Sequence, residues 1–377
     1  MQRFTLFFRL CLVSCIYLVL TFSNISNAQP SANNSFKDTL ALPAMRIGGA
    51  LKLERQPIVA VAIVKKRIIG VGLRGLIVLS DDGGATWRQA QVPVQSDLTA
   101  LNFPTQQTHG WAVGHDGVIL ATTDMGETWT KQYDGKMAAT ALPAYYQKLV
   151  EAGDASMQRY LNQTILNAKV PASLPYLGVY FKNEQVGYVV GSFGSILMTQ
   201  DGGKTWEPLL HQVDNEQFFN LNDIQPIGGT LYIVGERGII WKLDPMKQHF
   251  VSLSTGYRGS FFSIAGHGDT LLAVGLGGTA FRSVDAGATW HQIQLGTSMN
   301  LTSISTTADS QRPLIMSQDG EVFIGKADWK TFQALPIKQP MVFASNIAAY
   351  TSGRLILVGY SGIKVEQLLP SSPAGKE

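Results

Sequence analysis

Beyond residue 28, this chain contains no cysteine. Its 377 residues include two cysteines, Cys11 and Cys15, and both lie near the N-terminus. The rest of the chain therefore has no disulfide, no thiol nucleophile and no cysteine-ligated metal. A disulfide-free domain must be stabilised by burial of apolar surface, and about 350 residues are ample to form such a core.

Strong charge of either sign is also lacking. Apart from Arg3 and Arg9 in the N-terminal segment, the chain has 28 basic residues against 27 acidic ones. This balance gives no support for nucleic-acid binding or for strong attraction to a membrane surface.

The apolar run over residues 10–22 is too short for a transmembrane helix, which needs roughly 20 apolar residues. It lies between a basic segment and Ser26-Asn27-Ala28, the pattern of a secretory signal cleaved after Ala28. Leu12 to Cys15 also resembles a lipoprotein box, although residues 16–22 stay apolar after the cysteine. The sequence therefore predicts export to a periplasm, with a lipid anchor on Cys15 as the alternative.

A short glycine motif repeats along the chain. Its form is apolar-Gly-x-x-Gly-apolar, and its seven closing glycines are Gly75, Gly117, Gly194, Gly238, Gly278, Gly320 and Gly362. Neighbouring copies are 40 to 44 residues apart, except for one interval of 77. Each repeat reads as four short strands, A to D, with the glycine turn between B and C. The sequence therefore predicts an all-β fold, a seven-bladed β-propeller of four-stranded antiparallel blades.

A second motif, Ser/Thr-x-Asp-x-Gly-x-Thr-Trp, stands between strands C and D of four repeats. Its aspartates are expected to accept backbone N–H bonds inside a turn, and its tryptophans to be buried between blades. We predict a structural role for these residues, which are Asp82, Trp87, Asp124, Trp129, Asp201, Trp206, Asp285 and Trp290.

The last repeat ends after its third strand. The segment 45–55 includes a strand-like run at 50–54, and we expect it to supply the missing outer strand and so close the ring. The predicted organisation is a signal peptide at 1–28, a flexible lead at 29–42, the propeller at 43–370 and a tail at 371–377.

The long interval places about 35 extra residues between blades two and three, as an insert over about 140–172. Pro143 to Ala152 is expected to form one helix, and Asp154 to cap a second with Met157, Leu161 and Ile165 on one face. Because connectors between blades share a face with the B-to-C turns, we expect this helical hairpin to overhang that face, opposite the Asp-motifs.

Arginines and aromatics gather on the same predicted face. Such residues on rigid loops are typical of an interaction surface, although a solvated rim with ordinary ion pairs is the alternative. The candidate partner-binding residues are Arg74, Asp116, Phe193, Arg237 and Tyr360 in the turns, Tyr257 and Arg258 in a connector, and Tyr145, Tyr146 and Arg159 in the insert.

The pairing of the two motifs, as in Val190 to Trp206, resembles the photosystem II stability/assembly factor family of Asp-box (BNR repeat) propellers. The resemblance covers about residues 43–368. It implies an exported or lumenal propeller that escorts membrane-protein subunits during assembly, without catalysis. The helical insert departs from the compact pattern of photosynthetic members, and in other bacteria an envelope membrane complex is the expected client.

Asp-boxes also occur in sialidases, so a glycoside hydrolase or a carbohydrate-binding propeller is the alternative. The nearest match to the sialidase arginine motif, Arg46-Ile47-Gly48, lacks its proline. Asp116, Glu236 and Asp319 lie on different blades, too far apart round a ring to act as a carboxylate pair. We expect a monomeric, non-enzymatic protein without cofactor or metal. Its expected partner is an integral membrane protein or envelope complex, with no nucleic acid bound and no membrane insertion after signal cleavage.

Overall fold

The computed structural model describes residues 38–48, 51–104, 108–170, 174–307, 312–338 and 341–368. The compact unit that contains the propeller begins at Thr39. The predicted signal peptide and the predicted tail lie outside the described residues.

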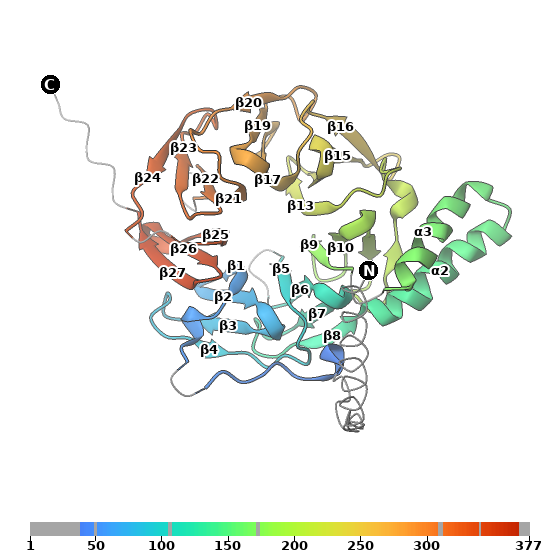
Figure 1. Cartoon of the computed structure of the whole chain (residues 1–377), viewed down its shortest axis with the longest axis horizontal. Helices are drawn as coiled ribbons and strands as arrows, with labels where there is room; N and C mark the ends of the chain where they lie inside the picture. The colour runs from blue at the N-terminus through green and yellow to red at the C-terminus, as the bar shows by residue number, and fades with distance from the viewer. Residues whose placement is uncertain are drawn as a thin grey trace, which may run out of the picture. The chain divides into compact units, whose positions relative to one another are not determined.

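Seven antiparallel sheets follow one another round a ring (Figure 1), which confirms the seven-bladed propeller. Blade 1 contains β1 (Ile58–Val64), β2 (Arg67–Gly72), β3 (Ile77–Ser80) and β4 (Arg88–Gln89), paired in that order. The first strand of each blade lines the centre and contacts the first strands of both neighbours, β25 against β1 included.

The remaining strands are β5 (Leu98–Asn102), β6 (Gly110–Gly114), β7 (Ile119–Thr122) and β8 (Thr130–Tyr133) in blade 2; β9 (Tyr176–Phe181), β10 (Gly187–Gly191), β11 (Ile196–Thr199) and β12 (Glu207–Pro208) in blade 3; β13 (Leu221–Ile227), β14 (Thr230–Gly235), β15 (Ile239–Asp244) and β16 (His249–Ser254) in blade 4; β17 (Phe261–His267), β18 (Thr270–Gly275), β19 (Ala280–Ser283) and β20 (His291–Ile293) in blade 5; β21 (Leu301–Thr306), β22 (Pro313–Ser317), β23 (Val322–Gly325) and β24 (Phe332–Leu335) in blade 6; and β25 (Ala344–Tyr350), β26 (Arg354–Gly359) and β27 (Gly362–Gln367) in blade 7.

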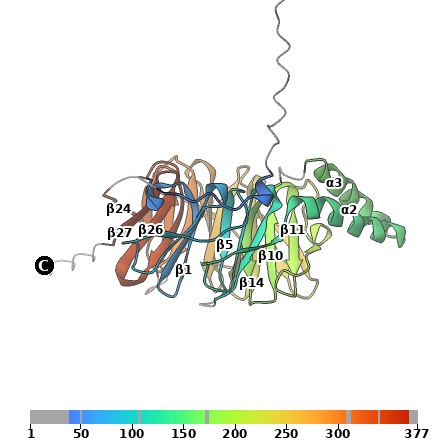
Figure 2. The ribbon, with the colours of Figure 1, turned by 90° about the horizontal axis from the view of Figure 1, so that it is seen from below.

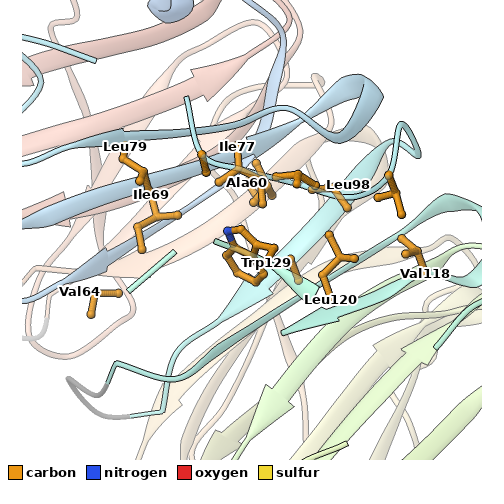
Figure 3. Packing of buried hydrophobic residues seen from close by; sticks show 14 of the residues in the cluster. Ala60, Val64, Ile69, Ile77, Leu79, Leu98, Val118, Leu120 and Trp129 are labelled. Carbon is orange, nitrogen blue, oxygen red and sulfur yellow. The ribbon is translucent and has the colours of Figure 1, made fainter. Parts of the chain in front are cut away.

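The core lies between the faces of neighbouring blades. Between blades 1 and 2, Trp129 packs among Ile69, Leu79 and Leu120, and all four are buried (Figure 3). Each aliphatic side chain buried in this way contributes about 1.5–3 kcal/mol to folding. The repeated apolar B and C strands therefore stabilise the ring one blade interface at a time.

Every inner strand carries a β-bulge at its second residue, which the sequence did not reveal. The bulge residue can aim its side chain at the next blade. Thr99 donates to Tyr176 O at 2.6 Å, Asn222 to Phe261 O at 2.7 Å, and Ser345 to Ile58 O at 3.2 Å. The last of these bonds closes the ring between blades 7 and 1.

The first glycine of the repeated motif is required by space. A Cβ on Gly114 would lie 2.1 Å from Asp97 O, and Gly72, Gly191, Gly235 and Gly275 meet the equivalent carbonyl at 2.0–2.3 Å. The second glycine, as at Gly117 with φ of 63°, supplies the left-handed conformation that the turn needs.

The insert is a helical hairpin, α2 (Gly135–Glu151) and α3 (Gln158–Ala168), but it begins earlier than predicted. Asp134 caps α2 by accepting from Lys136 N and Met137 N, both at 3.0 Å. Pro143 therefore lies inside α2 rather than at its start, where it removes one helical hydrogen bond. Asp154 accepts from Ser156 N at 3.1 Å, as expected of a cap.

The prediction for one side chain on the buried face of α3 is wrong. Ile165 is 45% exposed, whereas Leu161 and Thr164 are buried. The helix rests on the ring through Leu161 and the next turn, so Ile165 points away from that contact.

Two predictions about the segment before blade 1 are corrected. Residues 39–42 were expected in a flexible lead, but Thr39–Ala41 form a 3₁₀ turn and Leu40 is buried in the core of blades 1 and 2. The outer strand of blade 7 was expected from 50–54, but Leu53–Arg55 form a 3₁₀ turn. That turn packs against β27 without joining the ladder, so blade 7 has three strands among the described residues.

Candidate functional site

The B-to-C turns and the connectors between blades lie together on one side of the ring, which we call the turn face. Gly75 N donates to Ser96 O at 2.8 Å, and Gly238 N donates to Gly259 O at 2.7 Å, so turns and connectors touch. The hairpin leaves the ring here, since α2 contacts the turn His115–Gly117. Seen edge-on, α2 and α3 extend outward beside the rim (Figure 2), rather than overhanging the turn face as predicted from the sequence.

Four of these turns hold a bulky residue in the left-handed region. Arg74, Asp116, Phe193 and Arg237 have φ values of 52–60°, and blade 5 has Gly277 at the equivalent position with φ of 66°. This conformation costs a non-glycine residue roughly 1–2 kcal/mol. Glycine meets the same geometry without that cost, so these four residues bear a backbone strain that also occurs in the Asp-motif turns, at Met125 and Ala286.

A polar residue just before three inner strands locks each turn to the next blade. Asp97 Oδ1 accepts from Arg74 N at 2.7 Å, Asn220 Oδ1 from Phe193 N at 2.8 Å, and Asn300 Oδ1 from Gly277 N at 2.9 Å. This clamp was not predicted from the sequence, although an Asp or Asn followed by leucine recurs at the three positions. The clamp fixes the turn backbones rigidly.

Three acidic groups of the turn face are already occupied, whereas Glu321 in the turn of blade 6 and Glu216 in the connector between blades 3 and 4 are exposed. Asp116 accepts from Ser96 Oγ at 2.6 Å and Thr39 Oγ1 at 3.0 Å, Glu236 from Asn220 N at 3.0 Å, and Asp319 from Ser317 Oγ at 2.5 Å. All three are half-buried and belong to different blades. Each carboxylate serves its own turn, and the three do not form a shared site.

Four cations of the turn face are exposed and unpaired. Arg74, Arg237, Arg258 and Lys338 are exposed, and among the described residues none of them takes part in an ion pair. The turn face therefore presents four unpaired cations among the described residues, while the carboxylates of Asp116, Glu236 and Asp319 are held in turn hydrogen bonds.

Exposed apolar side chains accompany these cations. Phe193 and Tyr360, which the sequence singled out, are 49% and 59% exposed. The structure adds four residues that the sequence analysis missed, namely Leu276, Met299, Val342 and Phe343, which are 40–61% exposed. Their positions in turns and connectors were visible in the repeat, but their exposure was not.

The insert residues predicted to bind a partner attach the hairpin to the ring instead. Tyr146 is fully buried and accepts from Leu210 N at 3.1 Å, and burial raises the pKa of its hydroxyl. Tyr145 donates to Glu207 Oε1 at 2.9 Å, and its pKa is raised to about 12 by burial and by this carboxylate. Arg159 donates to Glu216 O at 2.7 Å and lies over the Phe218 ring.

Tyr257 is likewise engaged within the protein. It is half-buried, donates to Leu276 O at 2.9 Å and packs against Phe261. Of the ten candidate residues, the free and exposed ones are Arg74, Phe193, Arg237, Arg258 and Tyr360.

The Asp-motifs occupy the opposite side, which we call the box face. Asp124 accepts from Thr122 Oγ1 at 2.7 Å, from Thr128 N at 3.0 Å and from Thr128 Oγ1 at 2.6 Å. Trp129 Nε1 donates to Gly126 O at 3.0 Å. The boxes of Asp82 and Asp285 repeat these bonds.

The third box departs from this pattern. Asp201 keeps its bonds, and those from Thr205 lower its pKa to about 2. The buried Nε1 of Trp206, however, has no hydrogen-bond partner. Its ring is half-buried, as are those of Trp87 and Trp290, so of the four box tryptophans predicted to be buried Trp129 is the one that is fully buried. The aspartates act as local turn braces, as predicted from the sequence.

A channel of about 460 Å³ runs between the inner strands. Of the described side chains that line it, Asp223 is the one ionisable group, and burial raises its pKa. Its carboxylate accepts from Gln225 Nε2 at 3.0 Å and from Ser263 Oγ at 3.2 Å. The bond from Ser263 joins blades 4 and 5, whereas Gln225 lies on the same strand as Asp223.

The described part of the chain contains neither a cluster of metal-ligating side chains nor a helix that could span a membrane. No three His, Cys, Asp or Glu side chains lie close enough together to hold a metal ion. No described helix is long and apolar enough to cross a membrane.

The family model of the photosynthesis system II assembly factor YCF48 matches residues 55–150 and 160–255. The chain is 25% identical over 205 residues to the chloroplastic photosystem II stability/assembly factor HCF136 of Cyanidioschyzon merolae, covering 50% of this chain and 43% of that protein. It is 22% identical to the photosystem II assembly lipoprotein Ycf48 of Synechococcus sp. strain CC9902, covering 50% and 49%. The matches thus span about half the length of these relatives.

Solved structures share the fold. YCF48 bound to D1 peptide superposes with a TM-score of 0.60 at 16% identity, covering 87% of this chain and all of that one. YCF48 from Cyanidioschyzon merolae gives 0.61 at 14%, covering 83% and 96%, and the WD40 propeller of Doa1 gives 0.57 at 11%, covering 87% and 95%.

Proposed function

Because this chain belongs to the family of the photosystem II assembly factor YCF48, we propose that it is an exported, non-enzymatic scaffold that helps to assemble or stabilise a membrane-protein complex. Its client-binding site is the turn face, where an acidic, extended segment of the client contacts Arg74, Arg237 and Arg258. A related propeller was solved with a D1 peptide, which supports a peptide segment as the ligand.

The proposal rests on a difference between the arginines of the turn face and three of its carboxylates. The three arginines are exposed and unpaired among the described residues, whereas Asp116, Glu236 and Asp319 are bonded within their own turns. Guanidinium groups bind carboxylates through two parallel hydrogen bonds, so such a face selects acidic ligands. Buried arginine contacts can each contribute a few kcal/mol to binding, more than contacts at a solvated rim.

Rigidity of the face supports a binding role. The clamps at Asp97 and Asn220 hold the turn backbones before any client arrives. A preorganised surface loses little conformational entropy on binding, so modest contacts suffice for useful affinity. We place this monomeric scaffold in the periplasm, where its exposed cations can reach the outer ends of membrane-protein subunits.

The test is client capture. The tagged, exported protein is incubated with solubilised membranes of its own organism, and bound proteins are identified by mass spectrometry. Wild type is compared with Arg74→Ala/Arg237→Ala and with the control Lys204→Ala/Lys330→Ala, which removes two exposed cations from the box face.

We expect a membrane-protein subunit to be enriched by wild type and control, and to be lost with the arginine variant. Equal capture by all three proteins would remove the turn-face arginines from the proposal. Release of sugar from sialosides by the wild type would contradict a non-enzymatic scaffold.

A further inference from the structure

Five exposed apolar side chains lie on the turn face of three consecutive blades. Leu276 is 45% exposed, Met299 40%, Val342 61%, Phe343 57% and Tyr360 59%. Apolar side chains that gather in one exposed region mark a contact with a partner or a membrane. We call this set the apolar patch of blades 5–7.

Hydrogen bonds and close contacts hold the patch residues together. Tyr360 N donates to Phe343 O at 3.2 Å, and their rings lie 6.1 Å apart. In blade 5, the connector that precedes Met299 packs on the turn of Leu276, because a Cβ on Gly278 would lie 2.0 Å from Thr297 O. The patch is thus a row of single side chains on neighbouring loop tips.

Positive charge adjoins this patch. Arg258 lies in the connector that leads into blade 5, and Lys338 in the connector that leads into blade 7, and both are exposed. In the turn of blade 6, Asp319 is engaged with Ser317, while Glu321 is exposed. Two exposed cations and one exposed acid therefore adjoin the patch, and the near-zero net charge of the whole chain does not register this small local excess of positive charge.

We propose that the apolar patch of blades 5–7 rests on the surface of an anionic lipid bilayer. Leucine, methionine, valine and aromatic side chains at loop tips can enter the boundary between headgroups and acyl chains, while Arg258 and Lys338 attract anionic headgroups. The absence of membrane contact expected from the sequence relied on net charge alone, which does not register this local arrangement.

A bilayer fits this patch better than a second protein does. The five side chains stand on separate tips of three blades, and a flat, deformable surface can accept them all without a complementary shape. The adjoining cations supply the charge complementarity that anionic lipid requires. The inference goes beyond the proposed client binding and holds whatever the client is.

Flotation with lipid vesicles tests the inference. The exported protein is mixed with vesicles of phosphatidylethanolamine and phosphatidylglycerol, or of phosphatidylcholine alone. The patch variant is Leu276→Asp/Val342→Asp. The matched control is Met246→Asp/Val284→Asp, which makes the same change at two exposed apolar positions of the box face, 92% and 48% exposed. Circular dichroism first establishes that all proteins fold alike.

We expect wild type and control to bind the anionic vesicles, and the patch variant to bind about tenfold more weakly, since both apolar contact and local charge are lost. Failure of wild type to bind, or an equal loss in both variants, overturns the inference. So does unchanged binding of the patch variant combined with complete loss in Arg258→Ala/Lys338→Ala, because the attraction is then electrostatic only.

Client capture separates this inference from the proposed function. Capture from detergent-solubilised membranes contains no bilayer, so the patch variant should capture the client as wild type does. If the patch variant loses capture and no vesicle binding occurs, the patch contacts a protein and the inference fails. If capture fails for every protein while vesicle binding behaves as expected, the proposed function fails and the bilayer contact remains.

Discussion

The two faces of the propeller are built from the same repeats but differ in how the arginines next to the repeated motifs are used. On the box face, Asp124 accepts three hydrogen bonds from its own turn, and Arg67 and Arg88 both pair with Asp81 and Glu127. On the turn face, arginines in strained backbone conformations remain exposed. A repeat that satisfies itself stabilises a scaffold, and unsatisfied groups on that scaffold are available for a partner.

The hairpin sharpens the same contrast. Its tyrosines and its arginine were predicted from the sequence to bind a partner. Tyr146 and Arg159 instead attach the insert to the loop between blades 3 and 4. An irregular insertion is therefore not by itself a binding site, and what decides is whether its polar groups are already used.

The largest expected effect concerns the box tryptophans. Trp129→Ala should reduce the free energy of unfolding by about 3–5 kcal/mol, because a fully packed aromatic site is emptied. Trp129 is 4% exposed. Denaturation in urea measures the loss, and a value below about 1 kcal/mol would contradict the packing role.

Trp206→Ala should lose less, about 1–3 kcal/mol, since its ring is half-buried and removal of its unpaired N–H relieves an unsatisfied donor. From the repeat alone the two tryptophans look equivalent. Equal losses in the two variants would show that the third box is as regular as the second.

The next largest loss of stability should come from removing an aspartate of the Asp-motif. Asp124→Ala should reduce the free energy of unfolding by about 1–2 kcal/mol, because Thr128 N and two hydroxyl groups lose their acceptor. Urea denaturation measures this loss, and Asp124→Asn, which keeps one acceptor oxygen, should recover part of it. No recovery in Asp124→Asn would assign the effect to charge rather than to the turn hydrogen bonds.

Acid should destabilise the fold by protonating the aspartates of the box face. Hydrogen bonds lower the pKa of Asp201 and Asp285 to about 2, from 3.8 without these bonds. Groups with a depressed pKa stabilise the fold above their unfolded pKa, and this stability is lost as the pH falls from about 4 towards 2. Asp223, whose pKa is raised by burial, acts in the opposite direction.

Urea midpoints at several pH values between about 5 and 2 measure this loss. Asp201→Asn should make the dependence shallower, since one titrating brace is removed. An unchanged slope in that variant would mean that other carboxylates dominate the acid response.

Much of the propeller fold was predictable because it follows from sequence motifs that recur in each blade. The glycine turns gave the number of blades, and the Asp-motif gave the place of Asp82 and Trp87 in a turn. Both signals are local in sequence and recur, so each copy corroborates the others. The start of α2 was missed because a single cap, Asp134, governs it and has no second copy.

The candidate site was only partly predictable. Arg74 and Arg237 were found from their place in the motif, but whether a side chain is free depends on neighbours from the next blade. Glu236 and Asp116 look as available as the arginines until Asn220 and Ser96 are placed beside them. Likewise, the run at 50–54 has strand composition but packs against β27 as a turn, since a sheet edge can be covered without being paired.

The smallest effect on stability is the most informative about the turn face. Arg237 has φ of 60° and an exposed side chain, while Gly277 has φ of 66° at the equivalent place in blade 5. Arg237→Gly should raise the free energy of unfolding by up to about 1 kcal/mol, because glycine relieves the left-handed strain. The converse change, Gly277→Ala, should lower it by about 1 kcal/mol, since nothing lies within 4 Å of the added Cβ and the backbone is the remaining cost.

If Arg237 is kept for a partner, the stabilised Arg237→Gly protein should capture less client than wild type, whereas Gly277→Ala should capture as much. Gain in stability combined with loss of binding is the expected signature of a residue retained for function. Urea denaturation and client capture on the same preparations measure both quantities. A variant that is more stable and binds equally well would show that the strained arginine has no part in the site, and would shift the proposed contact to Arg74 and Arg258.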